Sequence, residues 1–184
     1  MNLTNHFLIA MPGLADPNFS KTVTYMCSHD KSGAMGIVIN RPSPLTLGAV
    51  LEQMSLDVEP QPAAEALPVF HGGPVLQERG FVLHRPAGDY EALLEVRDDI
   101  AVATSRDILS AIAAGNGPAD VLVALGYAGW GAGQLENEFA QNAWLSGPAD
   151  AEVIFEVPTD ERWERAAKLL GVDIERLSGQ AGHA

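Results

Sequence analysis

The segment Gly126–Gly133, with the sequence Gly-Tyr-Ala-Gly-Trp-Gly-Ala-Gly, has the residue types of a ligand-binding turn. It follows an apolar run and precedes a predicted helix, a position where backbone N–H groups can bind an anion. It does not match the nucleotide-binding patterns, because no register gives G-x-G-x-x-G and Ala132 stands where a phosphate-binding loop needs lysine. Two interpretations stay open. The glycines allow a tight turn in which Tyr127 and Trp130 pack, or the segment forms a ligand or partner surface.

A histidine precedes two glycines at His71-Gly72-Gly73-Pro74, a pattern similar to the oxyanion loop of esterases. Such an esterase also needs a nucleophilic serine in a G-x-S-x-G turn, and no serine of this chain has those neighbours. Without a nucleophile, oxyanion donors have no intermediate to stabilise. We therefore regard Gly72 and Gly73 as spatial neighbours of the Gly126–Gly133 segment rather than as catalytic groups.

Cys27 and His29 stand two residues apart in a predicted strand, which would place both side chains on the same face. A structural zinc site would need two further ligands. A lone cysteine in an apolar strand is more often part of the core, and thiolate chemistry needs an accessible, electropositive site. We therefore expect neither a metal nor a cofactor.

Two carboxylate pairs are also present, Asp98-Asp99 and Glu136-x-Glu138. The aspartates fall where a tight turn between two predicted strands is expected, and turn chemistry explains them. The glutamates lie two apart in a predicted helix, where side chains do not face each other, so they make a poor acid–base pair. We expect both pairs to be solvated.

Asn40 and Arg41 end an apolar predicted strand. Arg41 could bind a carboxylate or phosphate with two parallel hydrogen bonds, or it could cap neighbouring carbonyl groups, and we favour capping. The complete predicted site for a ligand or partner contains Asn40, Arg41, Gly72, Gly73, Gly126, Tyr127, Gly129, Trp130, Gly131 and Gly133.

Acidic residues dominate the charge, because 11 Lys and Arg face 24 Asp and Glu, a formal net charge of −13. After Arg106 the next basic residue is Arg162, and many carboxylates lie between them. Nucleic-acid affinity depends on lysine and arginine displacing counterions, so we expect no direct binding to nucleic acid. The single cysteine fits a reducing compartment, and no apolar run is long enough to span a membrane. We therefore predict a cytoplasmic protein.

The elements that would position these residues come from local patterns. Leu47, Val50, Leu51 and Met54 have helical spacing, and a second helix begins at Thr104 or Ser105 and ends at Gly115. A helix over Gln134–Gln141 and a last helix from Thr159 to Gly171 are also predicted. Asp57–Pro68 is predicted to be a loop whose side chains need not pack against the core. The predicted strands are His6–Met11, Thr22–Ser28, Ala34–Asn40, Val69–His71, Phe81–His84, Leu93–Val96, Ile100–Ala103, Val121–Leu125 and Val153–Val157.

This order of elements favours one α+β domain over 1–177, with a mixed sheet and helices packed on it. Residues 178–184 are predicted to be a frayed tail. Several motifs resemble the AlgH/YqgE family of bacterial proteins over about 5–171. They include Gly33-Ala-Met-Gly-Ile-Val-Ile-Asn-Arg-Pro42, Gly72-Gly-Pro-Val75 and Leu125-Gly-Tyr-Ala-Gly-Trp-Gly-Ala-Gly-Gln-Leu-Glu136. The resemblance implies a bent, split sheet that forms a pseudo-barrel flanked by helices, and it assigns no catalytic or cofactor residue.

No complete catalytic constellation is present, which favours a protein that is not an enzyme. The leading hypothesis is a module that binds another protein, including an indirect regulator of the kind that the family name implies. The alternative is a small-molecule-binding protein or enzyme that uses Gly126–Gly133 for an anionic ligand. Direct binding to DNA ranks last, because the net charge opposes it.

Overall fold

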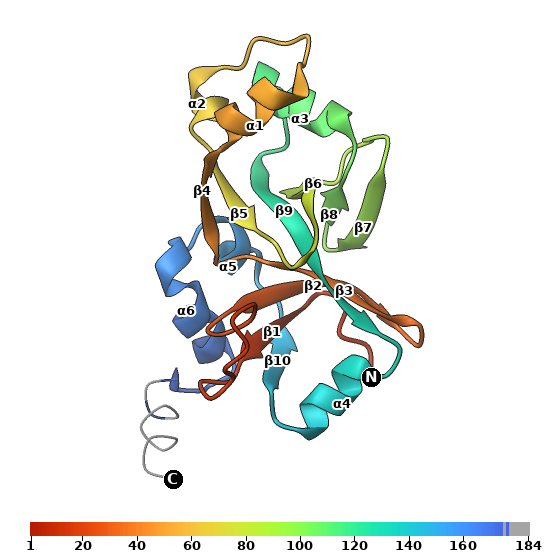
Figure 1. Cartoon of the computed structure of the whole chain (residues 1–184), viewed down its shortest axis with the longest axis vertical. Coiled ribbons are helices and arrows are strands. Elements are labelled where there is room, and N and C mark those ends of the chain that lie inside the picture. Colours follow the sequence, from red (N-terminus) through yellow and green to blue (C-terminus); the bar gives the residue numbers. More distant parts are fainter. Residues whose placement is uncertain (175, 177–184) are drawn as a thin grey trace.

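Strand β9 (Asp120–Gly131) runs through the centre of the molecule and connects its two halves (Figure 1). A computed structural model describes residues 1–174 and 176 of the 184-residue chain. The first part of β9 pairs with β6 and, in parallel, with β5, whereas its last part pairs antiparallel with β3. The described residues form one sheet in the order β10-β1-β2-β3-β9-β6-β8-β7, with β4 and β5 beside it. The other strands are β1 (His6–Ala10), β2 (Val23–Asp30), β3 (Gly33–Val38), β4 (Pro42–Thr46), β5 (Pro68–His71), β6 (Val75–Arg85), β7 (Leu93–Arg97), β8 (Ile100–Ala103) and β10 (Trp144–Pro148).

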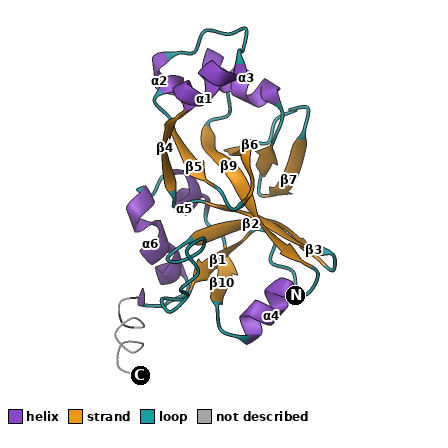
Figure 2. Ribbon diagram, in the orientation of Figure 1, coloured by secondary structure: helices purple, strands orange, loops and turns teal. Residues whose placement is uncertain are grey.

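The helices cover the curled sheet at three places (Figure 2). Helices α1 (Leu47–Met54), α2 (Pro62–Glu65) and α3 (Arg106–Ala114) lie at the top in this view. Helix α4 (Gln134–Ala140) lies at the bottom. Helices α5 (Ala151–Phe155) and α6 (Arg162–Leu169), joined by a 3-10 turn over Thr159–Glu161, lie at the side. None of the described helices is long and apolar enough to cross a membrane.

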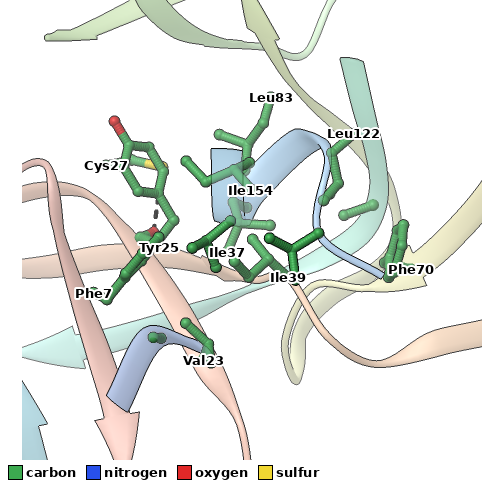
Figure 3. Close-up of a cluster of buried hydrophobic side chains, with 14 of the residues drawn as sticks. Phe7, Val23, Tyr25, Cys27, Ile37, Ile39, Phe70, Leu83, Leu122 and Ile154 are labelled. Carbon is green, nitrogen blue, oxygen red and sulfur yellow. Dashed lines mark hydrogen bonds between the residues drawn. The ribbon is translucent and has the colours of Figure 1, made fainter. Parts of the chain in front are cut away.

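Buried side chains form three clusters, one for each of these places. The central cluster includes Phe7, Tyr25, Ile39, Phe70 and Ile154 and fills the curl of the sheet (Figure 3). The upper cluster, under α1 to α3, includes Leu47, Val82, Ile108 and Val123. The lower cluster, beside α4, includes Leu8, Met26, Trp130, Leu135 and Trp144.

Several predicted helices are confirmed. Leu47 and Leu51 of α1 are buried, as their spacing predicts. Ile108, Leu109 and Ile112 of α3 are also buried. This helix ends at Gly115, whose φ of 83° is the left-handed conformation expected of a glycine C-cap. A mixed α/β single domain is likewise confirmed, with a curled antiparallel half-barrel sheet. The predicted tail at 178–184 lies outside the described residues.

Other local predictions are wrong. The predicted strand over Val153–Val157 is mainly helix α5, because the Asp150 side chain caps it by accepting from the Glu152 N–H and because Ile154 packs into the core. Within the predicted loop Asp57–Pro68, Pro62 begins the short helix α2.

Of the two residues predicted to begin the second helix, Thr104 and Ser105, the structure has Ser105 as the N-cap of α3, and the Ser105 hydroxyl donates to the Asp107 carboxylate. Trp144–Pro148 is a strand that local patterns missed, because β10 owes its conformation to pairing with β1.

Candidate functional site

Most of the Gly126–Gly133 segment is not a loop, because strand β9 continues through Gly131, and only Ala132 and Gly133 form a turn before α4. Its backbone pairs with β3, with Met35 opposite Gly129 and Gly33 opposite Gly131. Ladder hydrogen bonds to β3 therefore engage some of the backbone groups that the anion-binding interpretation needs to be free. Side chains alternate along a strand, so Ala128 and Trp130 lie on one face of β9 and Tyr127, Gly129 and Gly131 on the other.

The Trp130 face is buried. Trp130 is 5% exposed and belongs to the lower cluster, where its ring lies 5.9 Å from Phe19 and 6.2 Å from Trp144, centroid to centroid. Both indole N–H groups donate to Oε1 of Glu138, at 3.2 Å from Trp130 and 3.0 Å from Trp144. The prediction that Glu138 is merely solvated is therefore wrong, since its carboxylate satisfies two indole donors.

The other face of β9 is open. Gly129 and Gly131 are exposed and Tyr127 is half-buried. Residues paired directly across an antiparallel ladder point to the same side, so Gly33 and Met35 of β3 share this face. Because Gly33, Gly129 and Gly131 have no side chains, this face of the sheet is largely bare backbone.

An open groove with a volume of about 690 Å³ lies over this floor. We call it the sheet groove. The β2–β3 hairpin supplies one wall and the first part of β6 supplies the other. Its lining residues are Ser28, Asp30, Ser32, Gly33, Ala34, Met35, Val75, Leu76, Arg79, Phe81, Thr104, Tyr127, Gly129 and Trp130.

The β6 wall of the groove is a bulge that sequence reasoning missed. Val75 pairs with Tyr127, but the next pair is Gly80 with Leu125, so Leu76–Arg79 bulges out of the ladder. Leu76 is 54% exposed and has a φ of 48°, an unfavourable conformation for a bulky side chain. Local patterns predicted a strand only from Phe81, and only the glycine at position 80 hinted at a bulge.

Gly72 and Gly73 lie beside Gly126 and Tyr127, as predicted for spatial neighbours. The Gly72 N–H donates to the Leu125 carbonyl at 2.8 Å, and the Gly72 carbonyl accepts from Val38 at 2.8 Å. A Cβ at Gly73 would lie 2.1 Å from the Tyr127 carbonyl carbon, and one at Gly126 would lie 2.4 Å from the Gly73 oxygen. The fold itself therefore requires these glycines, through close backbone approach.

Asn40 and Arg41 direct their side chains to the β1–β2 loop rather than to the groove. Asn40 accepts from the Val23 N–H and donates to the Lys21 carbonyl, both at 2.9 Å. Arg41 donates to the carbonyls of Pro17 at 2.6 Å and Ser20 at 2.9 Å. The capping role favoured for Arg41 thus agrees with the structure.

Cys27 and His29 do not share a face. A bulge in β2 shifts the register between Met26 and Ser28, which reverses the alternation. Cys27 packs in the central cluster, where burial raises its pKa to about 12. His29 instead accepts from the Leu3 N–H at Nδ1 and contacts Glu136 at 2.6 Å through Nε2. Glu136 is therefore not simply solvated.

Glu136 and the aspartate pair have structural partners. The backbone N–H of Glu136 and the His29 ring hold the pKa of its carboxyl below the usual range. Asp98 and Asp99 form the predicted turn between β7 and β8, with φ of 54° and 64°. Asp99 also accepts from the Ala87 N–H at 3.1 Å. Among the described residues, no group of three or more His, Cys, Asp or Glu side chains is placed to hold a metal ion.

The curled half-barrel sheet with its helices defines a mixed α/β class of protein, and comparison identifies the family. A model of the AlgH-like family matches residues 7–175, so the chain belongs to this family. The predicted resemblance is thereby confirmed.

Relatives match over nearly their whole length. A UPF0301 protein from Thioalkalivibrio sulfidiphilus is 61% identical over 183 residues, covering 100% of this chain and 97% of the relative. The solution structure of the AlgH protein from Pseudomonas aeruginosa is 52% identical in sequence and matches with a TM-score of 0.83. The match covers 100% of this chain and 97% of the AlgH chain. The crystal structure of a protein from Corynebacterium diphtheriae shares the fold, with a TM-score of 0.72 at 16% sequence identity. The match covers 96% of this chain and 91% of the other chain.

Proposed function

We propose that this protein is a non-enzymatic module that binds an extended segment of a protein partner in the sheet groove. The observation that carries the proposal is the open face of β9, where bare backbone lies between Tyr127 and the β2–β3 hairpin. Tyrosine is a frequent anchor in protein interfaces, because it supplies a large contact area together with a polar end.

Gly131 supports the proposal because the fold does not require glycine there. The nearest atom to a Cβ at this position would be Oε1 of Gln134, at 3.9 Å. Its backbone has no positive φ, in contrast to Gly73 and Gly126. A glycine without a structural reason on an open floor fits a partner chain that approaches the backbone closely.

The two walls of the groove carry opposite charges. The Ser32 hydroxyl and N–H both donate to the Asp30 carboxylate and hold its pKa below the usual range, so it is ionised at neutral pH. Arg79 lies on the β6 wall, with Thr104 Oγ1 at 3.4 Å from Nη2. Exposed Leu76 adds an apolar contact. This mixture suits a peptide with both apolar and charged side chains better than nucleic acid.

We propose that the protein acts in the cytoplasm, since its cysteine is free and buried. A partner that is itself a regulatory protein would make it an indirect regulator. We favour this proposal over the anionic-ligand alternative, because Ala128–Gly131 pair with β3.

In-cell photocrosslinking tests the proposal. A photoreactive phenylalanine replaces Gly131, which pairs with the groove residue Gly33 on the open face of β9. As a matched control it replaces Gly13, which also has open space at Cβ and lies on neither β9 nor β3. We expect one protein to be captured repeatedly from position 131, not from position 13, and to be lost when Tyr127→Ala is added. Equal capture from both positions, or none from position 131, would contradict the proposal.

A further inference from the structure

We propose that the pocket between α1 and α3 is a binding site for an uncharged, mainly apolar small molecule. This pocket lies on the upper face of the sheet, against the upper cluster. Its floor comes from neighbouring strands, because Gly80 pairs with Leu125, and Val82 pairs with both Val123 and Ala103. These paired residues point to the same side, so the floor is continuous and apolar.

The two helices form walls on either side of this floor. Val50 and Met54 of α1 face the pocket from one side, and Leu109 of α3 faces it from the other. Arg106 at the start of α3 donates to the Met54 carbonyl at the end of α1, at 2.6 Å. This hydrogen bond links the two helix ends across the gap. The space between the helices, which is partly open to solvent, measures about 490 Å³, which lies within the range of small-molecule pockets.

Gly80 leaves the middle of the floor empty. A Cβ built at this position would meet nothing within 4 Å, and the backbone φ is not in the left-handed region. A larger side chain would therefore fit without strain and fill the space. An apolar floor that is left open between two linked helices is surface that a ligand can bury.

The residues at the mouth define the chemistry of the ligand. Arg106 and Glu78 place one positive and one negative charge there, and both residues are exposed. Gln53 and Gln77 add amide groups. Because the charges balance, the mouth favours neither anions nor cations, whereas the amides can bond a neutral polar group. An apolar body with an uncharged polar end fits this combination.

The pocket shares only Thr104 with the sheet groove among the lining residues, and the inference does not depend on the proposed function. The bulge of β6 divides the two, with Gln77 and Glu78 lining the pocket while Leu76 and Arg79 line the groove. A ligand in the pocket would contact α1 and α3, which supply no residue to the groove.

Titration of the full-length protein with N-phenyl-1-naphthylamine tests the proposal. This uncharged probe fluoresces strongly in apolar surroundings. The variant Gly80→Leu fills the floor, and Gly13→Leu is the matched control, because its Cβ also meets open space but lies outside the pocket. We expect saturable binding with one site per chain for the natural protein and for the control. Gly80→Leu should weaken binding at least tenfold while its melting temperature stays equal or rises.

Absence of saturable binding to the natural protein, or unchanged affinity of folded Gly80→Leu, would overturn the proposal. Amide chemical shifts of the natural protein keep the test decisive if Gly80→Leu fails to fold. The probe should then perturb the amides of Gly80, Leu109 and Leu125. Perturbation confined to Gly129 and Gly131 on the open face of β9 would overturn the pocket assignment.

Discussion

The two faces of the last part of β9 differ in kind, although alternate residues of one short motif build both. On one face Trp130 is 5% exposed among aromatic rings and its N–H is bound by Glu138. On the other face Gly129 and Gly131 leave the backbone bare, and Tyr127 lines an open groove. The glycine–aromatic motif therefore has two roles at alternate positions: one face stabilises the fold and the other remains available for binding.

Trp130→Ala should give the largest loss of stability. Truncating a buried tryptophan removes apolar contacts and leaves a cavity, so we expect the free energy of unfolding to fall by about 4 kcal/mol. Urea denaturation followed by circular dichroism measures it. A loss below about 1 kcal/mol would mean that this face is not part of the core.

Glu138→Ala should have the next largest effect. It removes the acceptor shared by the indole groups of Trp130 and Trp144, and unsatisfied buried donors cost about 2 kcal/mol. Glu138→Gln keeps a side-chain oxygen and serves as the control, with a smaller expected loss in the same urea experiment. Equal losses for the two variants would show that charge, not hydrogen bonding, is responsible.

Tyr127→Ala should destabilise the fold less. Its ring lies 5.4 Å from the Phe81 ring, centroid to centroid, and such an aromatic pair contributes about 1 kcal/mol. We expect a loss of that size on thermal or urea denaturation, together with the loss of partner binding. If stability fell as far as in Trp130→Ala, Tyr127 would belong to the core and the contrast between the two faces would fail.

Gly131→Ala should have the smallest effect on stability, a change within about 0.5 kcal/mol, because its Cβ meets only a distant side-chain atom. Gly73→Ala is the informative contrast, since its Cβ would lie 2.1 Å from the Tyr127 backbone at a φ of 157°. Melting temperatures of the two variants separate a glycine that the fold requires from one that it does not. Similar destabilisation by both would contradict the distinction.

Elements whose residue spacing and end residues both follow local rules could be predicted from the sequence. Helix α3 has apolar residues at helical spacing and Gly115 at its end, and the β2–β3 hairpin has a short glycine-containing turn. The last part of β9 could not be predicted, because glycine disfavours strands and its conformation comes from pairing with distant β3. Helix α5 was missed because the β-branched Val153 and Ile154 favour a strand, and capping with burial outweighs that preference.

The candidate site could be predicted only in part. The unusual composition of the motif identifies Tyr127, Gly129 and Gly131 as candidate residues. That they lie on the opposite face from Trp130 follows only once the motif is known to be a strand, in which side chains alternate. Apart from Gly80, the bulge over Leu76–Arg79 has no local signature, because it exists only relative to the pairing of β6 with β9. The role of Glu138 has an indirect signal in the sequence, since the nearby Trp130 and Trp144 carry indole N–H groups that need acceptors when buried.

The most direct test of a partner-binding face is the affinity of the captured partner for two variants on opposite faces of β9. Isothermal titration would compare Tyr127→Ala, on the groove face, with Glu138→Gln, which touches the buried face. We predict at least a tenfold loss of affinity for Tyr127→Ala, as for an interface anchor, and a change within about twofold for Glu138→Gln. The reverse order, or an undiminished affinity of Tyr127→Ala, would contradict the assignment of the groove as the binding surface.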